Sequence, residues 1–133
     1  MVVPDNTVLL SFKLTVGRVA ITDGEMTTNE AIAHFKTERK EVNEYLYCYL
    51  RNFNFQTMGS TSSIATAVNS KIIKRMPFVV PTDAEMIHFH ALVGPMFRAI
   101  KSNQAENERL TSIRDTLLPK LMSGEIDVSS VRL

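Results

Sequence analysis

Three short stretches near the N-terminus have the composition of β-strands, because β-forming side chains dominate and partly alternate with polar ones. They are TVLLSFKL (7–14), RVAIT (18–22) and AIAHF (31–35). The first two are separated by Thr15-Val16-Gly17, which predicts a β-hairpin with its turn at Gly17. The polar residues 23–30 are then expected to form a loop before the third strand.

The hydrophobic period changes after Thr37 from that of a strand to that of a helix. Five apolar or aromatic residues recur on one helical face: Val42, Tyr45, Leu46, Tyr49 and Leu50. Thr37 is a suitable N-cap, and Glu38 and Glu41 suit a first turn. The pattern therefore predicts a helix that begins just after Thr37 and ends before Phe53.

The next thirty residues predict short elements. Residues 53–63 are rich in Ser and Thr around Gly59 and are expected to form a loop, and IATAV (64–68) a short strand. Asn69-Ser70 can cap a brief helix at 71–76. PFVVP (77–81), which lies between two prolines, is expected to be an edge or terminal strand.

A long helix is predicted from Thr82, where T-x-x-E forms a capping box with Glu85. From there a seven-residue repeat runs for about five heptads, as in coiled coils. One seam is Phe89, Met96, Asn103, Leu110 and Leu117, and the other is Val93, Ile100, Asn107, Arg114 and Leu121. Seven of these ten positions are apolar. Asparagine at seam positions is typical of coiled coils in which register and partner number are fixed.

This helix would be roughly 50 Å long if it ran unbroken to Pro119, at about 1.5 Å per residue. Gly94-Pro95 is expected to kink it or to split it in two. Its first turns, through Val93, are expected to pack on residues 1–80. The remaining turns are expected to pair with a partner helix, and the alternative is a helix that folds back entirely on its own chain.

Composition places the chain among ordinary folded proteins, with 133 residues, 44% hydrophobic and 22% charged. These patterns predict an α+β protein, in which a small mixed α/β lobe (1–81) is followed by a long coiled-coil-forming helix (82–122) and a tail (123–133). No apolar run has the length of a membrane span, and no signal peptide is evident at the N-terminus. With a single cysteine, Cys48, these features favour the cytoplasm.

The net charge of +1 gives no global signal for nucleic acid, but the distribution is uneven. No acidic residue occurs between Glu44 and Asp83, a stretch that contains Arg51, Lys71, Lys74 and Arg75. Such a surface can face phosphates. The alternative is that these are ordinary solvated surface charges.

Nothing in the sequence has the pattern of a catalytic or metal site. His88 and His90 point in different directions on a helix and make a poor metal pair. Cys48 lies beside a helix face, as a packed thiol does. Phosphate-binding and dinucleotide-binding glycine motifs are absent from the sequence. The chain is therefore expected to be a binding and spacing protein that catalyses no reaction itself.

Three segments together resemble the DNA specificity (S) subunit of type I restriction-modification systems. ENERLTSIRDTLLPKLMSGEIDV (106–128) is similar to the C-terminal conserved helix and tail of that family. VLLSFKLTVGRVAIT (8–22) and GSTSSIATAVNSKIIKRMPFVVP (59–81) resemble parts of its target recognition domain. The resemblance covers nearly all of residues 7–128, and its segments occur in the family's order.

The resemblance implies a subunit that recognises double-stranded DNA and performs no catalysis. A whole S subunit has two recognition domains and two long helices, which pair antiparallel and set the spacing of two DNA half-sites. It docks modification (methyltransferase) subunits, which use S-adenosylmethionine, and restriction subunits, which use ATP and magnesium. No cofactor and no metal is therefore expected on this chain.

The chain departs from the family because it has one short recognition domain and one long helix. The family's domain is about twice as long as residues 1–80, so the chain looks like a C-terminal piece. A second copy of the chain is then the nearest candidate partner for the helix, in a homodimer with antiparallel seams. The competing hypothesis is an interaction module that binds a partner through its helix and never contacts DNA.

Residues that suit DNA recognition lie on loops and at turns, where donors and cations reach bases and phosphates. The candidates are Lys13, Thr15 and Arg18 around the Gly17 turn, Gly59, Ser60, Thr61 and Ser62 in the polar loop, and Lys71 at the start of a short helix. Each has a structural alternative, as a solvent-side residue, an ion-pair partner or a mere connection. The candidates for helix pairing are Ile100, Asn103, Asn107, Leu110, Leu117 and Leu121.

Overall fold

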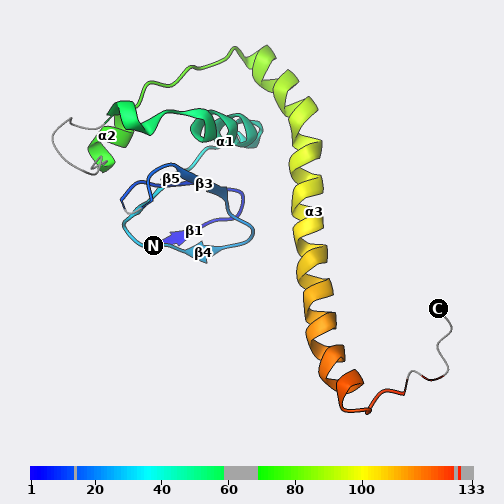
Figure 1. The fold of residues 1–133 in the computed structure, drawn as a ribbon. Coiled ribbons are helices and arrows are strands. Elements are labelled where there is room, and N and C mark those ends of the chain that lie inside the picture. Colours follow the sequence, from blue (N-terminus) through cyan, green and yellow to red (C-terminus); the bar gives the residue numbers. More distant parts are fainter. Residues whose placement is uncertain (14, 59–68, 128, 130–133) are drawn as a thin grey trace. The chain divides into compact units, whose positions relative to one another are not determined.

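The computed structural model of the protein describes residues 1–13, 15–58, 69–127 and 129 (Figure 1). The chain divides into two compact units, Met1–Gly94 and Pro95–Leu133. The first unit contains both sheets and the short helices, and the long helix begins in it and continues into the second. The α+β class predicted from the sequence is confirmed.

The first unit is built on a three-stranded antiparallel sheet in the order β3-β2-β5. The central strand β2 (Val8–Ser11) pairs with β3 (Arg18–Ile21) on one side and with β5 (Ile32–Phe35) on the other. All three predicted strands form, and β2 and β3 pair as a hairpin with Gly17 in the connection, but β2 ends at Ser11, so the connection is longer than the predicted turn at 15–17. Gly17 has φ +89, a left-handed conformation that glycine adopts without steric strain.

A second, two-stranded sheet joins the N-terminus to the segment that was expected to be only a loop. In it β1 (Val2–Val3) pairs antiparallel with β4 (Met26–Thr27). Neither strand was predicted, because two-residue strands carry no periodic signal. Val3 is fully buried.

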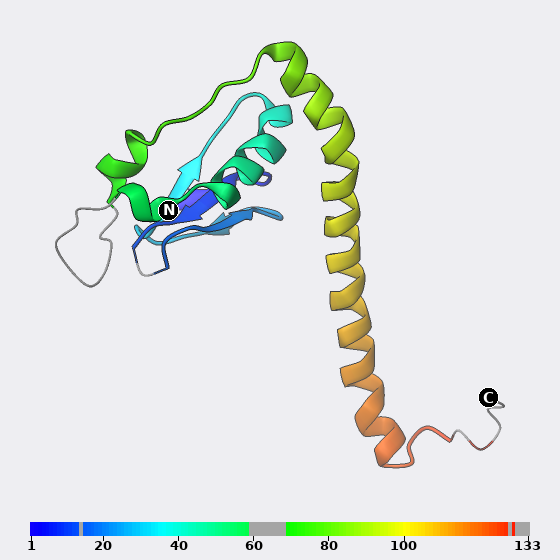
Figure 2. The same ribbon diagram turned by 45° about the horizontal axis from the view of Figure 1, so that its top comes forward.

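The core of the unit lies between the three-stranded sheet and α1 (Asn43–Asn52), which covers one face of it (Figure 2). Its buried members are Val8, Leu10, Phe12, Leu46, Leu50, Phe55 and Ile73. Leu46 and Leu50 belong to the helical face predicted from the sequence. Alternation along β2 sends Val8 and Leu10 to the same face, where the helix packs.

The start of α1 differs from the prediction. A single 3-10 turn, η1 (Lys40–Val42), precedes the helix, and the first residue of α1 is Asn43. Thr37 is not the N-cap, because its hydroxyl donates to the carbonyl of Arg39 rather than accepting an N–H of the helix. This local bond forms a turn instead of a cap, an alternative that threonine side chains offer the backbone.

The segment after α1 contains η2 (Phe55–Met58) and the short helix α2 (Ser70–Lys74). As predicted, Asn69 caps α2, and its Oδ1 accepts the N–H of Ile72 at 3.0 Å. The strand expected at 64–68 lies outside the described residues.

The segment 77–81 forms no strand, so that prediction was wrong. Pro77 and Pro81 lack the N–H groups that a ladder needs. The carbonyls of Pro77 and Val79 instead accept the hydroxyls of Tyr49 and Tyr45, both at 2.8 Å. Side chains of α1 therefore hold this connection.

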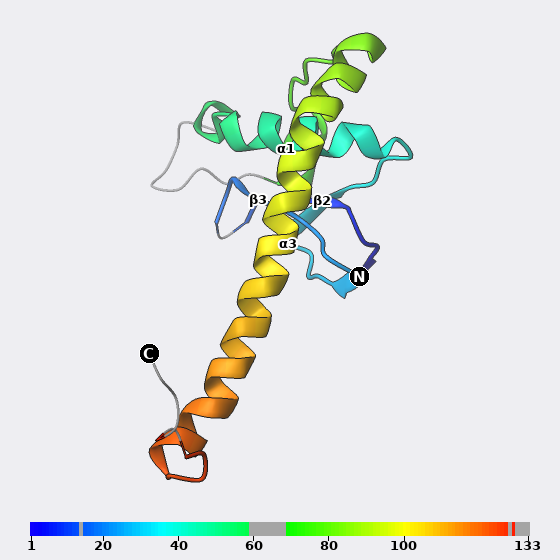
Figure 3. The ribbon, with the colours of Figure 1, turned by 90° about the vertical axis from the view of Figure 1, so that its right-hand side faces the viewer.

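The long helix α3 runs from Asp83 to Met122, 40 residues or about 60 Å (Figure 3). It continues through Pro95, so the helix is not split in two at Gly94-Pro95. It ends in a turn in which Gly124 has φ +74 and the N–H of Ile126 donates to the carbonyl of Lys120 at 3.2 Å. No helix in the described part of the chain is long and apolar enough to cross a membrane.

Candidate nucleic-acid interface

The β2–β3 hairpin tip presents three of the predicted DNA-binding residues to solvent. Lys13, Thr15 and Arg18 are all exposed. The hydroxyls of Thr15 and Ser11 lie 3.0 Å apart, and the N–H of Gly17 donates to the carbonyl of Ser11 at 3.0 Å. These bonds tie Thr15 and Gly17 to the end of β2.

A buried aromatic ring supports the hairpin tip from below. A Cβ atom placed on Gly17 would lie 3.1 Å from Cδ2 of Phe55, which is closer than an ordinary contact. Phe55 in turn packs edge to face on Phe53, with ring centroids 5.0 Å apart. The spacing between Gly17 and Phe55 has no periodic signal, so this contact could not be predicted from the sequence.

The same core cluster holds α2, the element that carries Lys71. Phe12 from the hairpin, Phe55 from η2 and Ile73 from α2 are buried together. Lys71 is exposed on α2. The hairpin tip and α2 are therefore fixed on one shared hydrophobic core. The other predicted DNA-binding residues, Gly59, Ser60, Thr61 and Ser62, lie outside the described residues.

Glu30 belongs to the connection between β4 and β5, and its acidic side chain lies next to Lys13 of the β2–β3 connection. Oε1 of Glu30 is 3.5 Å from Nζ of Lys13, and both side chains are exposed. Its own backbone N–H and the charge of Lys13 hold the pKa of Glu30 below its usual value. Residues 13 and 30 come together only because β5 pairs with β2, so the sequence carried no local sign of the contact.

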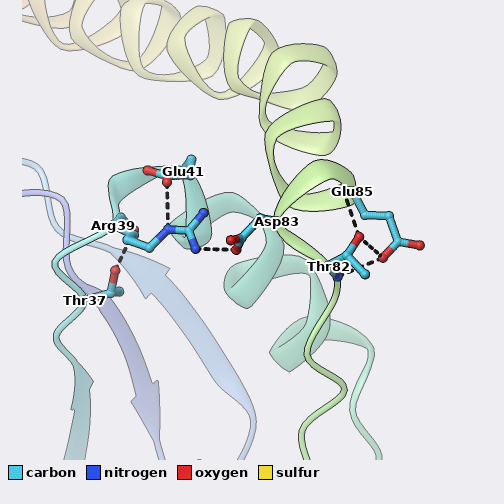
Figure 4. Close-up of polar contacts among 6 residues, drawn as sticks. All are labelled: Thr37, Arg39, Glu41, Thr82, Asp83 and Glu85. Atoms are coloured by element: carbon cyan, nitrogen blue, oxygen red, sulfur yellow. Dashed lines mark hydrogen bonds and ion pairs between the residues drawn. The ribbon is translucent and has the colours of Figure 1, made fainter.

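The start of α3 is fastened by polar bonds (Figure 4). The capping box is confirmed: Oε2 of Glu85 accepts the N–H and hydroxyl of Thr82 at 2.8 and 2.7 Å, and the Thr82 hydroxyl accepts the N–H of Glu85 at 3.3 Å. The guanidinium of Arg39 lies 2.6 Å from Asp83 and 2.8 Å from Glu41. Hydrogen bonds to the two carboxylates raise the pKa of Arg39.

Aromatic rings also join α3 to α1. The ring of Tyr45 meets Phe78 and Phe89 edge to face, each with centroids 5.8 Å apart. Burial raises the pKa of Tyr45. Nδ1 of His90 lies 3.0 Å from Oε2 of Glu44. The first turns of α3 thus pack on the lobe, as expected from the sequence.

The predicted pairing residues all lie on the second unit and are exposed in the single chain. The exposed fractions are 53% for Ile100, 49% for Leu110, 41% for Leu117 and 42% for Leu121, and Asn103 and Asn107 are also exposed. A stripe of apolar side chains in water is unfavourable, and burial against a partner would remove that free-energy penalty.

Chemistry-bearing residues are not gathered in the part of the chain that the structure describes. Within residues 1–13, 15–58, 69–127 and 129, no three His, Cys, Asp or Glu side chains come together as a metal site would need. Burial raises the pKa of the Cys48 thiol, which makes it a weaker nucleophile at neutral pH. The described part of the chain is thus a small α+β lobe followed in sequence by a long helix.

Comparison with known proteins assigns the family. The family model "Type I restriction modification DNA specificity domain" matches residues 1–111, so the chain belongs to this family. The HindI type I restriction enzyme specificity subunit of Haemophilus influenzae is 29% identical over 128 residues, 93% of this chain and 28% of that protein. The MjaIX specificity subunit of Methanocaldococcus jannaschii is 31% identical over 126 residues, 92% of this chain and 26% of that protein.

The chain thus spans about a quarter of the length of the curated relatives it matches. No solved structure matches it. The resemblance described from the sequence is therefore confirmed at the level of the family.

Proposed function

We propose that this chain is a non-catalytic DNA-recognition part of a type I restriction-modification system. The observation that carries the proposal is the family match over residues 1–111, which includes the lobe and most of α3. The two relatives are both named as specificity subunits. In this proposal the lobe binds duplex DNA, and methylation and cleavage take place on other subunits.

The proposed DNA contacts lie at the hairpin tip and on α2. Lys13, Arg18 and Lys71 would neutralise phosphates, and Thr15 with the polar residues 59–62 would supply hydrogen bonds. Two observations support this assignment. The proposed side chains in the described residues are exposed, and the hairpin and α2 pack on one buried hydrophobic cluster. Phosphate contacts would fix the register of the lobe on DNA, while hydroxyls and backbone groups near the grooves would read bases.

The long helix would serve assembly. Its exposed seam (Ile100, Asn103, Asn107, Leu110, Leu117 and Leu121) would pair with a second helix, for which another copy of the chain is the nearest candidate. Modification and restriction subunits would dock on the assembly, and S-adenosylmethionine, ATP and magnesium would bind to those subunits. Because the proposed ligand of this chain is double-stranded DNA, we infer that the chain acts in the cytoplasm.

Duplex-DNA binding measured across a salt series tests this proposal. The affinity of the full chain for a labelled 30-base-pair duplex should fall steeply with salt, because bound phosphates release counterions. The triple variant Lys13→Ala, Arg18→Ala, Lys71→Ala should bind more weakly and lose up to about 3 from the salt slope, roughly 0.9 per phosphate contact. The control variant Lys36→Ala, Lys40→Ala, Lys120→Ala removes the same number of positive charges and should keep a salt slope nearer that of the parent. Equal slopes in parent and first variant would contradict the assignment.

A second candidate is an interaction module that never contacts DNA. The exposed apolar seam of α3 favours it, since that surface suits a protein partner. Binding to a modification subunit with the same affinity in the presence and absence of DNA, together with no DNA affinity of the chain alone at low salt, would select this candidate.

A further inference from the structure

Glu30 lies in the connection between β4 and β5, where hydrogen bonds of its neighbours hold the backbone near the end of β2. The Oδ1 of Asn29 accepts the N–H of Ala31 at 3.0 Å, a local turn that encloses Glu30. The carbonyl of Ala31 accepts the N–H of Phe12 at 3.1 Å, which ties this turn to the end of β2. The backbone of Glu30 is therefore fastened on one side by its own turn and on the other by the sheet.

The side chain of Glu30 pairs with Lys13, one of the cations proposed to contact phosphate. The distance from Oε1 to Nζ is 3.5 Å, and the exposed fractions of the two side chains are 84% for Glu30 and 46% for Lys13. An ion pair this exposed adds little to folding, because water already solvates both groups. The ion pair therefore affects a charged ligand that approaches Lys13 more than it affects the stability of the fold.

A carboxylate in this position opposes phosphate binding in two ways. It neutralises Lys13 in the free protein, so a phosphate must displace it. Once Lys13 has moved to a phosphate, the unpaired carboxylate remains near the DNA backbone and repels it. Both effects act on the phosphates of the DNA backbone and are therefore independent of base sequence.

We propose that Glu30 limits the sequence-independent DNA affinity of the lobe by competing with phosphates for Lys13. This inference rests on the proposed function. Each available cation adds affinity for DNA of any sequence. By lowering that contribution, Glu30 would make DNA binding depend more on contacts to the bases.

Substitution Glu30→Gln in the full chain tests the inference, with fluorescein-labelled duplexes of two unrelated sequences as probes. The variant should bind both duplexes about fivefold more tightly at low salt, the factor for one unit-charge interaction at roughly 4 Å in water. Its salt slope should steepen by up to about 0.9, as for one added phosphate contact. An unchanged urea unfolding curve would show that the fold is intact.

Two further variants separate the mechanism from general charge effects. Glu25→Gln makes the same change in net charge in a loop that precedes β4, and should raise affinity much less. In a Lys13→Ala background, the gain from Glu30→Gln should shrink, because the competition for Lys13 has been removed. An equal gain in both backgrounds, or from Glu25→Gln, would overturn the proposal.

The remaining outcomes are also decisive. A loss of affinity in Glu30→Gln, confined to one of the two duplexes, would overturn the inference and indicate that the carboxylate accepts a hydrogen bond from a base, as from a cytosine amino group. No change in either duplex would also overturn it, while steep salt dependence in the parent chain would leave the proposed function standing. Absence of DNA binding by the parent chain at low salt would remove both.

Discussion

The rings of Tyr45 and Phe89 meet edge to face, with centroids 5.8 Å apart and planes at 90°. Tyr45 belongs to α1 and Phe89 to the second turn of α3, so the contact joins the lobe to the start of the long helix. The hydroxyl of Tyr45 donates to the carbonyl of Val79 in the same region. One side chain thus holds both the helix and the connection that leads into it.

Phe89→Ala should destabilise the lobe. Loss of a half-buried ring should lower the free energy of unfolding by about 2 kcal/mol, less than the roughly 3–5 kcal/mol for a fully buried one. Urea unfolding monitored by tyrosine fluorescence measures the change. Ile87→Ala is the matched control, because Ile87 is 59% exposed and should shift stability by less than about 0.5 kcal/mol. Equal effects of the two substitutions would contradict the packing described here.

Thr82→Ala should loosen the first turn of α3. It removes the hydroxyl that accepts the N–H of Glu85 and donates to its carboxylate. Loss of an N-cap typically lowers stability by about 1 kcal/mol. Amide hydrogen exchange should quicken at residues 83–86, and Thr82→Ser should restore protection. Unaltered exchange in the alanine variant would mean that the box contributes nothing.

Acid should weaken the same turn through Glu85. Hydrogen bonds from the hydroxyl and N–H of Thr82 hold the pKa of Glu85 below its usual value. A folded pKa below the unfolded one gives stabilisation that is present above the unfolded pKa, about 4.3, and is lost as the pH falls through the folded pKa. Protection factors at residues 83–86, which correct for the slower intrinsic amide exchange in acid, should therefore fall below about pH 4 in the parent. Glu85→Gln should flatten that fall, and protection factors that stay constant with pH in the parent would argue against the carboxylate.

Gly17→Ala should disturb the hairpin tip for two separable reasons. Gly17 and Gly24 both have positive φ, +89 and +82, which strains any alanine by about 1–2 kcal/mol. An added Cβ at Gly17 also meets Phe55 at 3.1 Å, whereas nothing lies within 4 Å at Gly24. Unfolding free energies should fall for both variants and further for Gly17→Ala. A larger loss for Gly24→Ala would mean that the Phe55 contact is not restrictive.

Leu110→Asp should abolish association through α3. Pairing would bury the new carboxylate in an apolar seam without a partner, which is strongly unfavourable. Light scattering across a concentration series measures solution mass. Ser112→Asp places the same charge on the opposite face of the helix and should leave the mass unchanged. If Leu110→Asp has the same mass as an associating parent, the proposed seam is wrong.

Local chemistry explains which elements could be predicted. The Gly17 hairpin, the buried face of α1 with Leu46 and Leu50, the Asn69 cap and the Thr82–Glu85 box all depend on residues close in sequence. The predictions failed where local patterns competed with distant partners. Residues 77–81 have the composition of a strand, yet the hydroxyls of Tyr45 and Tyr49 hold them without a neighbouring strand.

By itself, the sequence determined the α+β class, the strand–turn–strand of the hairpin and the long helix with its seven-residue repeat, because periodicity and local capping depend on neighbouring residues. The family followed from the similarity of whole segments to known specificity subunits. The tertiary structure alone decided that Glu30 faces Lys13, that Phe55 supports Gly17, and that Arg39 reaches Asp83. Such pairs are separated by 17 to 44 residues and meet only through strand pairing and core packing, for which one chain carries no local signal.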